Sequence, residues 1–172
     1  MSMPVAETEL RPLQPAHAEA MLRWMLDPEI ADNVGLRSTP TLERTRAWIA
    51  RTDVDAQAIY FAGHHVGNVV LDQFDDYLQT ARLSVYVGEP SARGRGVARE
   101  ALRMALAHGF GPRQLYRIWL TAHAGNARAL ALYTGLGFRQ EGVLRGDFLF
   151  RGERVDAVLL SMLRAEFEAL AG

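Results

Sequence analysis

The 172-residue sequence contains no cysteine and no lysine, and each absence removes a class of chemistry. Without cysteine the chain has no disulfides, no thiolate metal ligands and no cysteine nucleophile. All nineteen basic residues are arginine, which excludes a Schiff-base lysine and the lysine of a nucleotide-binding P-loop. The five histidines are scattered over predicted helices and turns, so we expect no metal site.

Strong net charge and long apolar runs are also missing. The formal net charge is −1, which gives no indication of a nucleic-acid partner. No apolar run approaches the length of about 18 residues needed for a membrane span. The N-terminal stretch MSMPVAETEL lacks the charged start and apolar core of a secretion signal, so we expect a cytoplasmic protein with no membrane partner.

The length favours one domain over residues 1–172. A chain of this size buries close to about 70% of the surface that its unfolded form exposes, so it can build a full core. Hydrophobic periodicity predicts the following order of elements. We expect strands at 5–13, 57–63, 65–74, 80–89, 115–122, 137–150 and 153–163, and helices at 16–26, 42–51, 97–109 and 126–135.

Residues 27 and 28 (Asp-Pro) are expected to end the first helix and to be followed by a loop. Three consecutive strands in the first half predict antiparallel pairing, and the later strand-helix alternation predicts a crossover connection. The predicted fold class is therefore α/β, with a mixed, largely antiparallel sheet and helices on both faces.

The stretch ARGRGVAREA, residues 92–101, places three arginines and two glycines at the start of a predicted helix. Glycine permits backbone conformations that other residues avoid, and a helix start presents unpaired N–H groups and a partial positive charge. Together these features predict an anion site, most often for a phosphate.

A dinucleotide site is one alternative. Residues 94–99 read GRGVAR, so the third glycine of the G-x-G-x-x-G fingerprint is missing. That fingerprint also needs an acidic residue at the end of the next strand, where this chain has Thr121 and Ala122. The match is therefore weak.

A different pattern fits the turn. Residues 93–98 satisfy [QR]-x-x-G-x-[GA], and NARALALYTGLGF follows about thirty residues later. In these two motifs, and in its element order, the chain resembles the GNAT superfamily of acyl-CoA-dependent N-acetyltransferases. The stretches VGEPSARGRGVAREAL and GVLRGDFLFRGERVDAVLLSML are most similar to the branch with ribosomal-protein and spermidine N-acetyltransferases.

The resemblance implies acetyl-CoA as cosubstrate. It places the coenzyme A pyrophosphate on the turn, with the following candidate residues: Arg93, Gly94, Arg95, Gly96, Val97, Ala98 and Arg99. It also implies that the strand ending near Val87 splays from its neighbour within the centre of the sheet. Unpaired main-chain groups there would bind the pantetheine arm like an added strand, and the proline at position 90 is a natural end to pairing.

Asn126 and Tyr133 lie seven residues apart, on one face of a predicted helix. Asn126 is a preferred helix cap, and the resemblance adds a contact with the cofactor. Tyr133 fits a core position, and the resemblance implies a hydroxyl near the thioester sulfur. With ordinary pKa values of about 10 for the phenol and 8.5 for a thiol, that proton transfer is uphill by about 2 kcal/mol.

The acceptor amine must be neutral to attack. At pH 7 this requires about 4.6 kcal/mol for a lysine-like amine but only about 1.1 kcal/mol for an α-amino group. The candidate carboxylates are Asp147, Glu29 and Asp32. A polyamine site generally needs paired carboxylates at the pocket, and the late strand RGDFLF offers one acid where a polycation site would benefit from more. The sequence therefore favours a protein N-terminal α-amine over spermidine, with other small amines ranked after both. The general base stays open.

Two other kinds of function are compatible with part of the pattern. A non-catalytic acyl-CoA-binding sensor would keep the turn but has no need of Tyr133. A structural partner protein would need neither feature. The sequence is also compatible with a homodimer.

Overall fold

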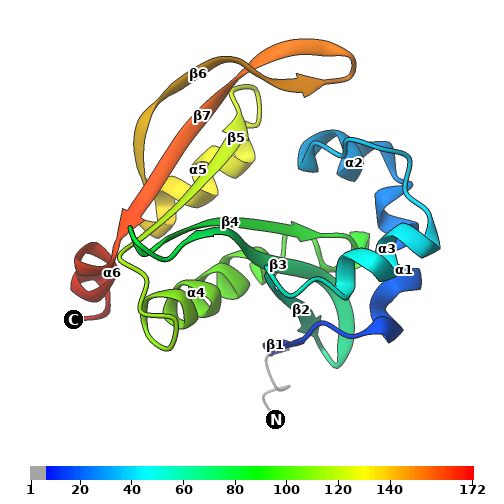
Figure 1. Cartoon of the computed structure of the whole chain (residues 1–172), viewed down its shortest axis with the longest axis horizontal. Coiled ribbons are helices and arrows are strands. Elements are labelled where there is room, and N and C mark those ends of the chain that lie inside the picture. Colours follow the sequence, from blue (N-terminus) through cyan, green and yellow to red (C-terminus); the bar gives the residue numbers. More distant parts are fainter. Residues whose placement is uncertain (1–6) are drawn as a thin grey trace.

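The computed structural model describes residues 7–172, in which seven strands form one sheet in the order β1-β2-β3-β4-β5-β7-β6 (Figure 1). The strands are β1 (Thr8–Pro12), β2 (Asp55–Phe61), β3 (His64–Asp75), β4 (Thr80–Val87), β5 (Arg117–His123), β6 (Arg139–Phe150) and β7 (Glu153–Leu163). The helices are α1 (Ala18–Met25), α2 (Pro28–Val34), α3 (Leu42–Ile49), α4 (Val97–Phe110), α5 (Ala127–Leu136) and α6 (Arg164–Ala171), with short 3₁₀ turns at Pro15–His17 and Pro90–Ala92.

The pairing confirms the predicted fold class. All neighbouring strands are antiparallel except β4 and β5, which run parallel. That parallel pair is short, because Thr80–Arg82 pair with Arg117–Trp119 and no further. Beyond this point β4 continues to Val87 and β5 to His123. The two central strands therefore diverge, as the sequence predicted.

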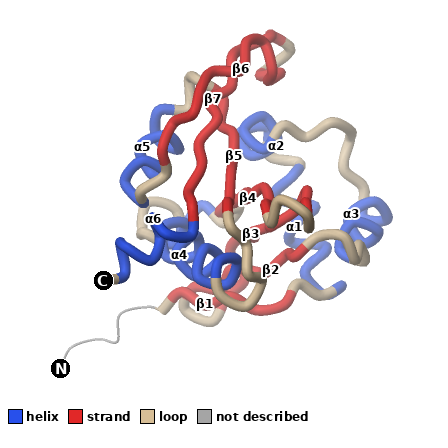
Figure 2. Tube along the Cα trace, turned by 60° about the vertical axis from the view of Figure 1, so that its left-hand side comes forward, coloured by secondary structure: helices blue, strands red, loops and turns tan. Residues whose placement is uncertain are grey.

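Helices cover both faces of the sheet (Figure 2). The main core lies under α4 and α5, where α4 buries one face formed by Ala101, Leu102, Ala105 and Leu106. A smaller cluster on the opposite face contains Trp24 from α1, Ile30 from α2 and Trp48 from α3. No helix within residues 7–172 is long and apolar enough to cross a membrane.

The sequence did not predict two of the helices, α2 and α6, and the first predicted strand begins outside the described residues. Asp27 and Pro28 end α1 as expected, but the Asp27 Oδ1 atom then accepts a hydrogen bond of 3.0 Å from the Glu29 N–H and caps α2. Proline is favoured at the first position of a helix, so it starts one here. Glu29 and Asp32 thus lie on a helix and not in a loop. The C-terminal α6 was also not predicted. The first strand was expected from residue 5, and residues 5 and 6 are not described.

Close contact between α1 and the end of β4 sets the position of the smaller cluster. Gly88 is buried, and a Cβ atom there would fall inside the contact distance of the Trp24 ring carbons. The Gly88 N–H donates to the Val66 carbonyl of β3 over 2.8 Å. Only glycine lets the indole of Trp24 pack this closely on the strand, so α1 is fixed where β4 ends.

We therefore expect Gly88→Ala to lower the free energy of unfolding by about 1–3 kcal/mol, because an added methyl overpacks the contact with Trp24. Urea denaturation checks this. Gly142→Ala is the matched control, since a Cβ at that position meets nothing within 4 Å. Equal stability of the two variants would contradict the close packing.

Candidate active site

The divergence of β4 and β5 opens a cavity of about 400 Å³. Its floor is formed by Val85–Val87 of β4 and by Thr121 and Ala122 of β5. The turn before α4 closes one end, α5 forms one side and α2 forms the other. The lining residues from those three parts are Ala92, Arg93, Gly94, Gly96, Val97, Ala98, Arg99, Asn126, Arg128, Ala129, Leu132, Tyr133, Glu29, Ile30, Asn33 and Val34.

The turn has the geometry of an anion cradle. Gly94 and Gly96 adopt φ values of +71° and +79°, and Gly96 immediately precedes α4. The N–H groups of the first helical turn, at Val97, Ala98 and Arg99, have no acceptor within the helix, and these residues line the cavity. The positive end of the α4 dipole adds to their attraction for a phosphate.

The three arginines of the turn are placed differently from one another. Arg99 lines the cavity and donates to the Gly135 carbonyl of α5 over 3.1 Å. Arg95 does not line the cavity, and its guanidinium lies over the Phe61 ring, 5.4 Å from the centroid. Arg93 turns back toward β4 and α2. The predicted group of residues is thus brought together at the cavity, with the side chain of Arg95 outside it.

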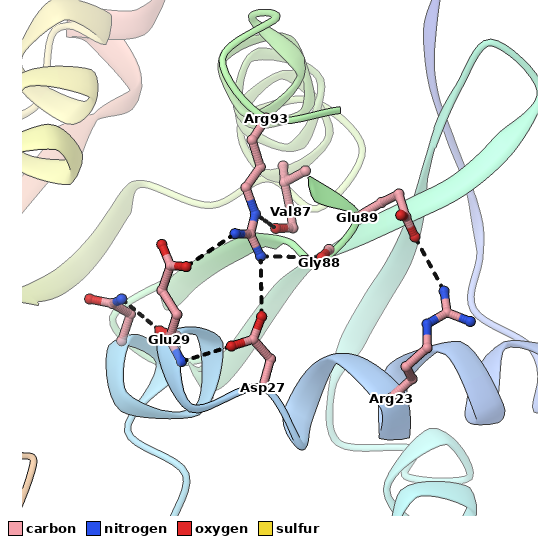
Figure 3. A network of polar contacts seen from close by, with 8 residues as sticks. Arg23, Asp27, Glu29, Val87, Gly88, Glu89 and Arg93 are labelled. Carbon is pink, nitrogen blue, oxygen red and sulfur yellow. Dashed lines mark hydrogen bonds and ion pairs between the residues drawn. The ribbon is translucent and has the colours of Figure 1, made fainter. Parts of the chain in front are cut away.

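Arg93 connects the turn to two other elements (Figure 3). Its Nε and Nη2 atoms donate to the carbonyls of Val87 and Gly88 over 3.1 and 3.2 Å. Its Nη1 atom lies 3.4 Å from the Glu29 carboxylate, and its Nη2 atom lies 4.0 Å from that of Asp27. The guanidinium therefore holds the end of β4 against the start of α2.

The outer edge of β4 faces the cavity. Main-chain groups alternate between the two sides of a strand, and the Gly88 N–H points to β3. Val85 and Val87 therefore present their groups on the side from which β5 has departed. The Val87 carbonyl accepts a hydrogen bond from Arg93. The Val87 N–H and the N–H and carbonyl of Val85 therefore remain directed at the cavity. This is the edge that the sequence predicted near Val87.

Asn126 and Tyr133 both line the cavity from α5. The Asn126 Oδ1 atom accepts from the Ala129 N–H over 3.2 Å, so it caps the helix as predicted. The Tyr133 side chain is buried, and burial raises the pKa of its hydroxyl to about 12. Tyr133 therefore keeps its proton at neutral pH and can donate it.

The candidate carboxylates are not gathered in one place. Glu29 lines the cavity, where it pairs with Arg93. Asp32 pairs with Arg151, at 3.2 Å. Asp147 lies on β6, exposed and outside the lining. The structure thus does not bring Asp147 next to Tyr133.

Sequence reasoning missed several residues at the cavity. Arg128 lines it from the first turn of α5, and its Nη2 atom would lie 3.8 Å from a Cβ built on Gly94. The sequence signal for Arg128 is its position two residues after Asn126, which puts it in the same first helical turn, facing the glycine turn. Asn33 has no such signal, yet its Oδ1 atom lies 3.1 Å from the His123 Nε2 atom and 3.4 Å from the Asn126 Nδ2 atom.

The family model described as an acetyltransferase (GNAT) domain matches residues 8–139. This range covers well over half of the chain and contains the divergent strands, the glycine turn and Tyr133. The chain therefore belongs to the GNAT family of acetyltransferase domains, as the two motifs indicated.

Individual relatives share only a modest fraction of their sequence with this chain. The chain is 27% identical over 107 residues to the spermidine N(1)-acetyltransferase of Escherichia coli strain K12, and the match covers 62% of this chain and 57% of that protein. It thus spans little more than half the length of this relative.

Solved structures share the fold over nearly the whole chain. Spermidine N-acetyltransferase from Vibrio cholerae, in complex with CoA and spermine, has a TM-score of 0.86 at 21% identity, covering 94% of this chain and 98% of that one. RimL, a ribosomal L7/L12 α-N-protein acetyltransferase in complex with coenzyme A, has a TM-score of 0.82 at 16% identity, covering 93% and 96%. At such identities the likeness is one of fold.

The contacts of Arg93 predict a loss of stability when its side chain is removed. Arg93→Ala should lower the free energy of unfolding by about 1–3 kcal/mol, because two part-buried carbonyls lose their donor. Arg95→Ala, which removes a guanidinium outside the cavity, should change it by less than about 0.5 kcal/mol. Urea denaturation of the two variants measures both values, and an Arg93→Ala variant as stable as Arg95→Ala would show that the contacts contribute nothing.

Proposed function

We propose that the chain is an acetyl-CoA-dependent N-acetyltransferase that moves an acetyl group to a primary amine by direct attack on the thioester. One observation carries the proposal. A single cavity joins the helix-start anion cradle, an unpaired strand edge and a buried tyrosine hydroxyl. We also propose that residues 1–172 act as one acetyltransferase domain.

The cavity suits the parts of coenzyme A in order. N–H groups at Val97 and Ala98 would hold the pyrophosphate, since Gly94 and Gly96 carry no side chain to obstruct its approach. Arg99 and Arg128 add positive charge beside it. The N–H of Val87 and the groups of Val85 would pair with the amides of the pantetheine arm as an added strand would. Asn126 lies on the opposite wall.

Tyr133 is the proposed general acid. As the amine nitrogen bonds to the thioester carbon, the C–S bond breaks and the Tyr133 hydroxyl gives its proton to the departing sulfur. The excess proton of the amine passes to water, and the tyrosinate regains a proton from solvent. A protein N-terminal α-amine and a polyamine or other small amine are the acceptor classes that the relatives suggest.

Gly96→Asp should abolish binding of coenzyme A, because a carboxylate in the cradle repels the phosphates. Gly63→Asp is the matched control, since Gly63 has a φ of +80° and no atom within 4 Å of a Cβ, as at Gly96, but lies in the β2–β3 turn. Titration calorimetry with coenzyme A measures both variants. Normal binding by Gly96→Asp would place the phosphates elsewhere, and absence of binding by the unmodified protein would contradict the proposed function.

Tyr133→Phe should lower kcat by about 10- to 1,000-fold with little change in acetyl-CoA affinity, because the ring still packs while the proton source is lost. Since burial raises the pKa of this hydroxyl to about 12, the unmodified enzyme should lose no activity through its ionisation below about pH 11. Initial rates from pH 6 to 10.5 test this. An equal loss of affinity and rate would make Tyr133 a packing residue, and full activity of Tyr133→Phe would exclude it as the acid.

A further inference from the structure

The carboxylates at the start and in the middle of α2 lie beside arginines of the protein itself. Asp27 and Glu29, at its start, both face the guanidinium of Arg93 (Figure 3). Asp32, one turn further on, is 3.2 Å from the Nε atom of Arg151, which follows β6. Asp27 and Glu29 therefore share one arginine, and Asp32 has an arginine of its own.

The residues beside these acids, at the end of α2 and on β6, are apolar and aromatic. Val34 lines the cavity, and a Cβ on the adjacent Gly35 would lie 3.5 Å from the Phe148 ring. His123, at the end of β5, packs against Phe148 and Phe150, with ring centroids 5.4 and 4.4 Å apart. Burial lowers the pKa of His123, which favours its neutral form at pH 7. The end of α2 and the β6–β7 hairpin thus meet along one rim that these apolar and aromatic side chains form.

We infer that this rim, which we call the acceptor opening (Val34, Gly35, His123, Phe148 and Phe150), selects a primary amine attached to an apolar group with no second positive charge. The inference rests on the proposed function, because it concerns the second substrate of the same cavity. Arg151 is the specificity-determining residue. By pairing with Asp32, it withdraws the carboxylate that would otherwise bind a second cation.

The carboxylates available at the acceptor opening determine whether it binds an apolar monoamine or a polycation better. A second ammonium or guanidinium that enters a partly buried opening loses hydration and needs a carboxylate to replace it. Of the carboxylates on α2, β6 and β7, those of Asp147, Glu153 and Asp156 have no salt-bridge partner within residues 7–172, and all three are exposed to screening by solvent. An apolar substituent, in contrast, gains from contact with the Phe148 and Phe150 rings.

Leucinamide and argininamide provide a matched test, because both present an α-amine and differ in an apolar or a cationic side chain. We expect the unmodified enzyme to acetylate leucinamide with a kcat/KM at least about tenfold higher than that for argininamide, and higher than that for spermidine. Arg151→Ala frees Asp32 and should reduce the leucinamide-to-argininamide ratio at least about threefold. Adding Asp32→Asn to that variant should restore the ratio.

Arg51→Ala is the control, since it removes an arginine paired with Asp53 at 2.7 Å, on residues that do not line the cavity, and should leave the ratio unchanged. Use of a ratio cancels any general loss of activity in a variant. Faster turnover of argininamide or spermidine by the unmodified enzyme would overturn the inference, as would an unchanged ratio in Arg151→Ala. Acetylation of none of the three amines by protein that binds coenzyme A would instead contradict the proposed function itself.

Discussion

The separation of β4 from β5 after Arg82 and Trp119 is the constraint on which the site depends. A parallel pair that continued to the ends of both strands would satisfy the edge of β4 with the edge of β5 and would leave no cavity. Buried main-chain groups need partners, so an interrupted pair is tolerated only where something else supplies them. Arg93 supplies one partner, to the Val87 carbonyl. The remaining groups of Val85 and Val87 face the cavity, where the proposed pantetheine arm would supply their partners.

Arg93 also explains how a short helix keeps its position over the cavity. The α2 helix has seven residues, too few to be stable alone. Ile30 packs it into the smaller cluster, and polar contacts hold its two ends, through Arg93 at the start and through Asn33 and Asp32 further along. Arg93, at the first position of the turn, thus mainly binds groups of the protein itself. In the proposed coenzyme A site, the backbone N–H groups of the turn, with Arg99 and Arg128, would hold the phosphates.

The strands, the glycine turn and the spacing of Asn126 and Tyr133 could be predicted because each depends on residues close in sequence. Alternation marks a strand, a positive φ favours glycine, and seven residues return to the same helix face. The α2 helix was missed because Asp-Pro ends one helix and begins another equally well. The pair of Asp32 and Arg151, beside the acceptor opening, joins residues 119 apart. No local pattern reports such a contact, since the fold alone brings the two residues together.

Burial of Tyr133 has two opposing effects on the proposed reaction. A pKa of about 12 keeps the hydroxyl protonated, but against a thiol of pKa about 8.5 in water it makes the proton transfer uphill by about 5 kcal/mol, instead of the 2 kcal/mol of an exposed tyrosine. The departing sulfur would occupy the same cavity, however, and removal of water disfavours a thiolate for the same reason that it disfavours a tyrosinate. The pKa difference between the two acids, which sets the free energy of the proton transfer, is therefore smaller than their separate values suggest. In the proposed mechanism, Tyr133 would be an effective donor only while α2 and the acceptor exclude water from this end of the cavity. The strength of the proposed acid would then depend on closure of the acceptor side.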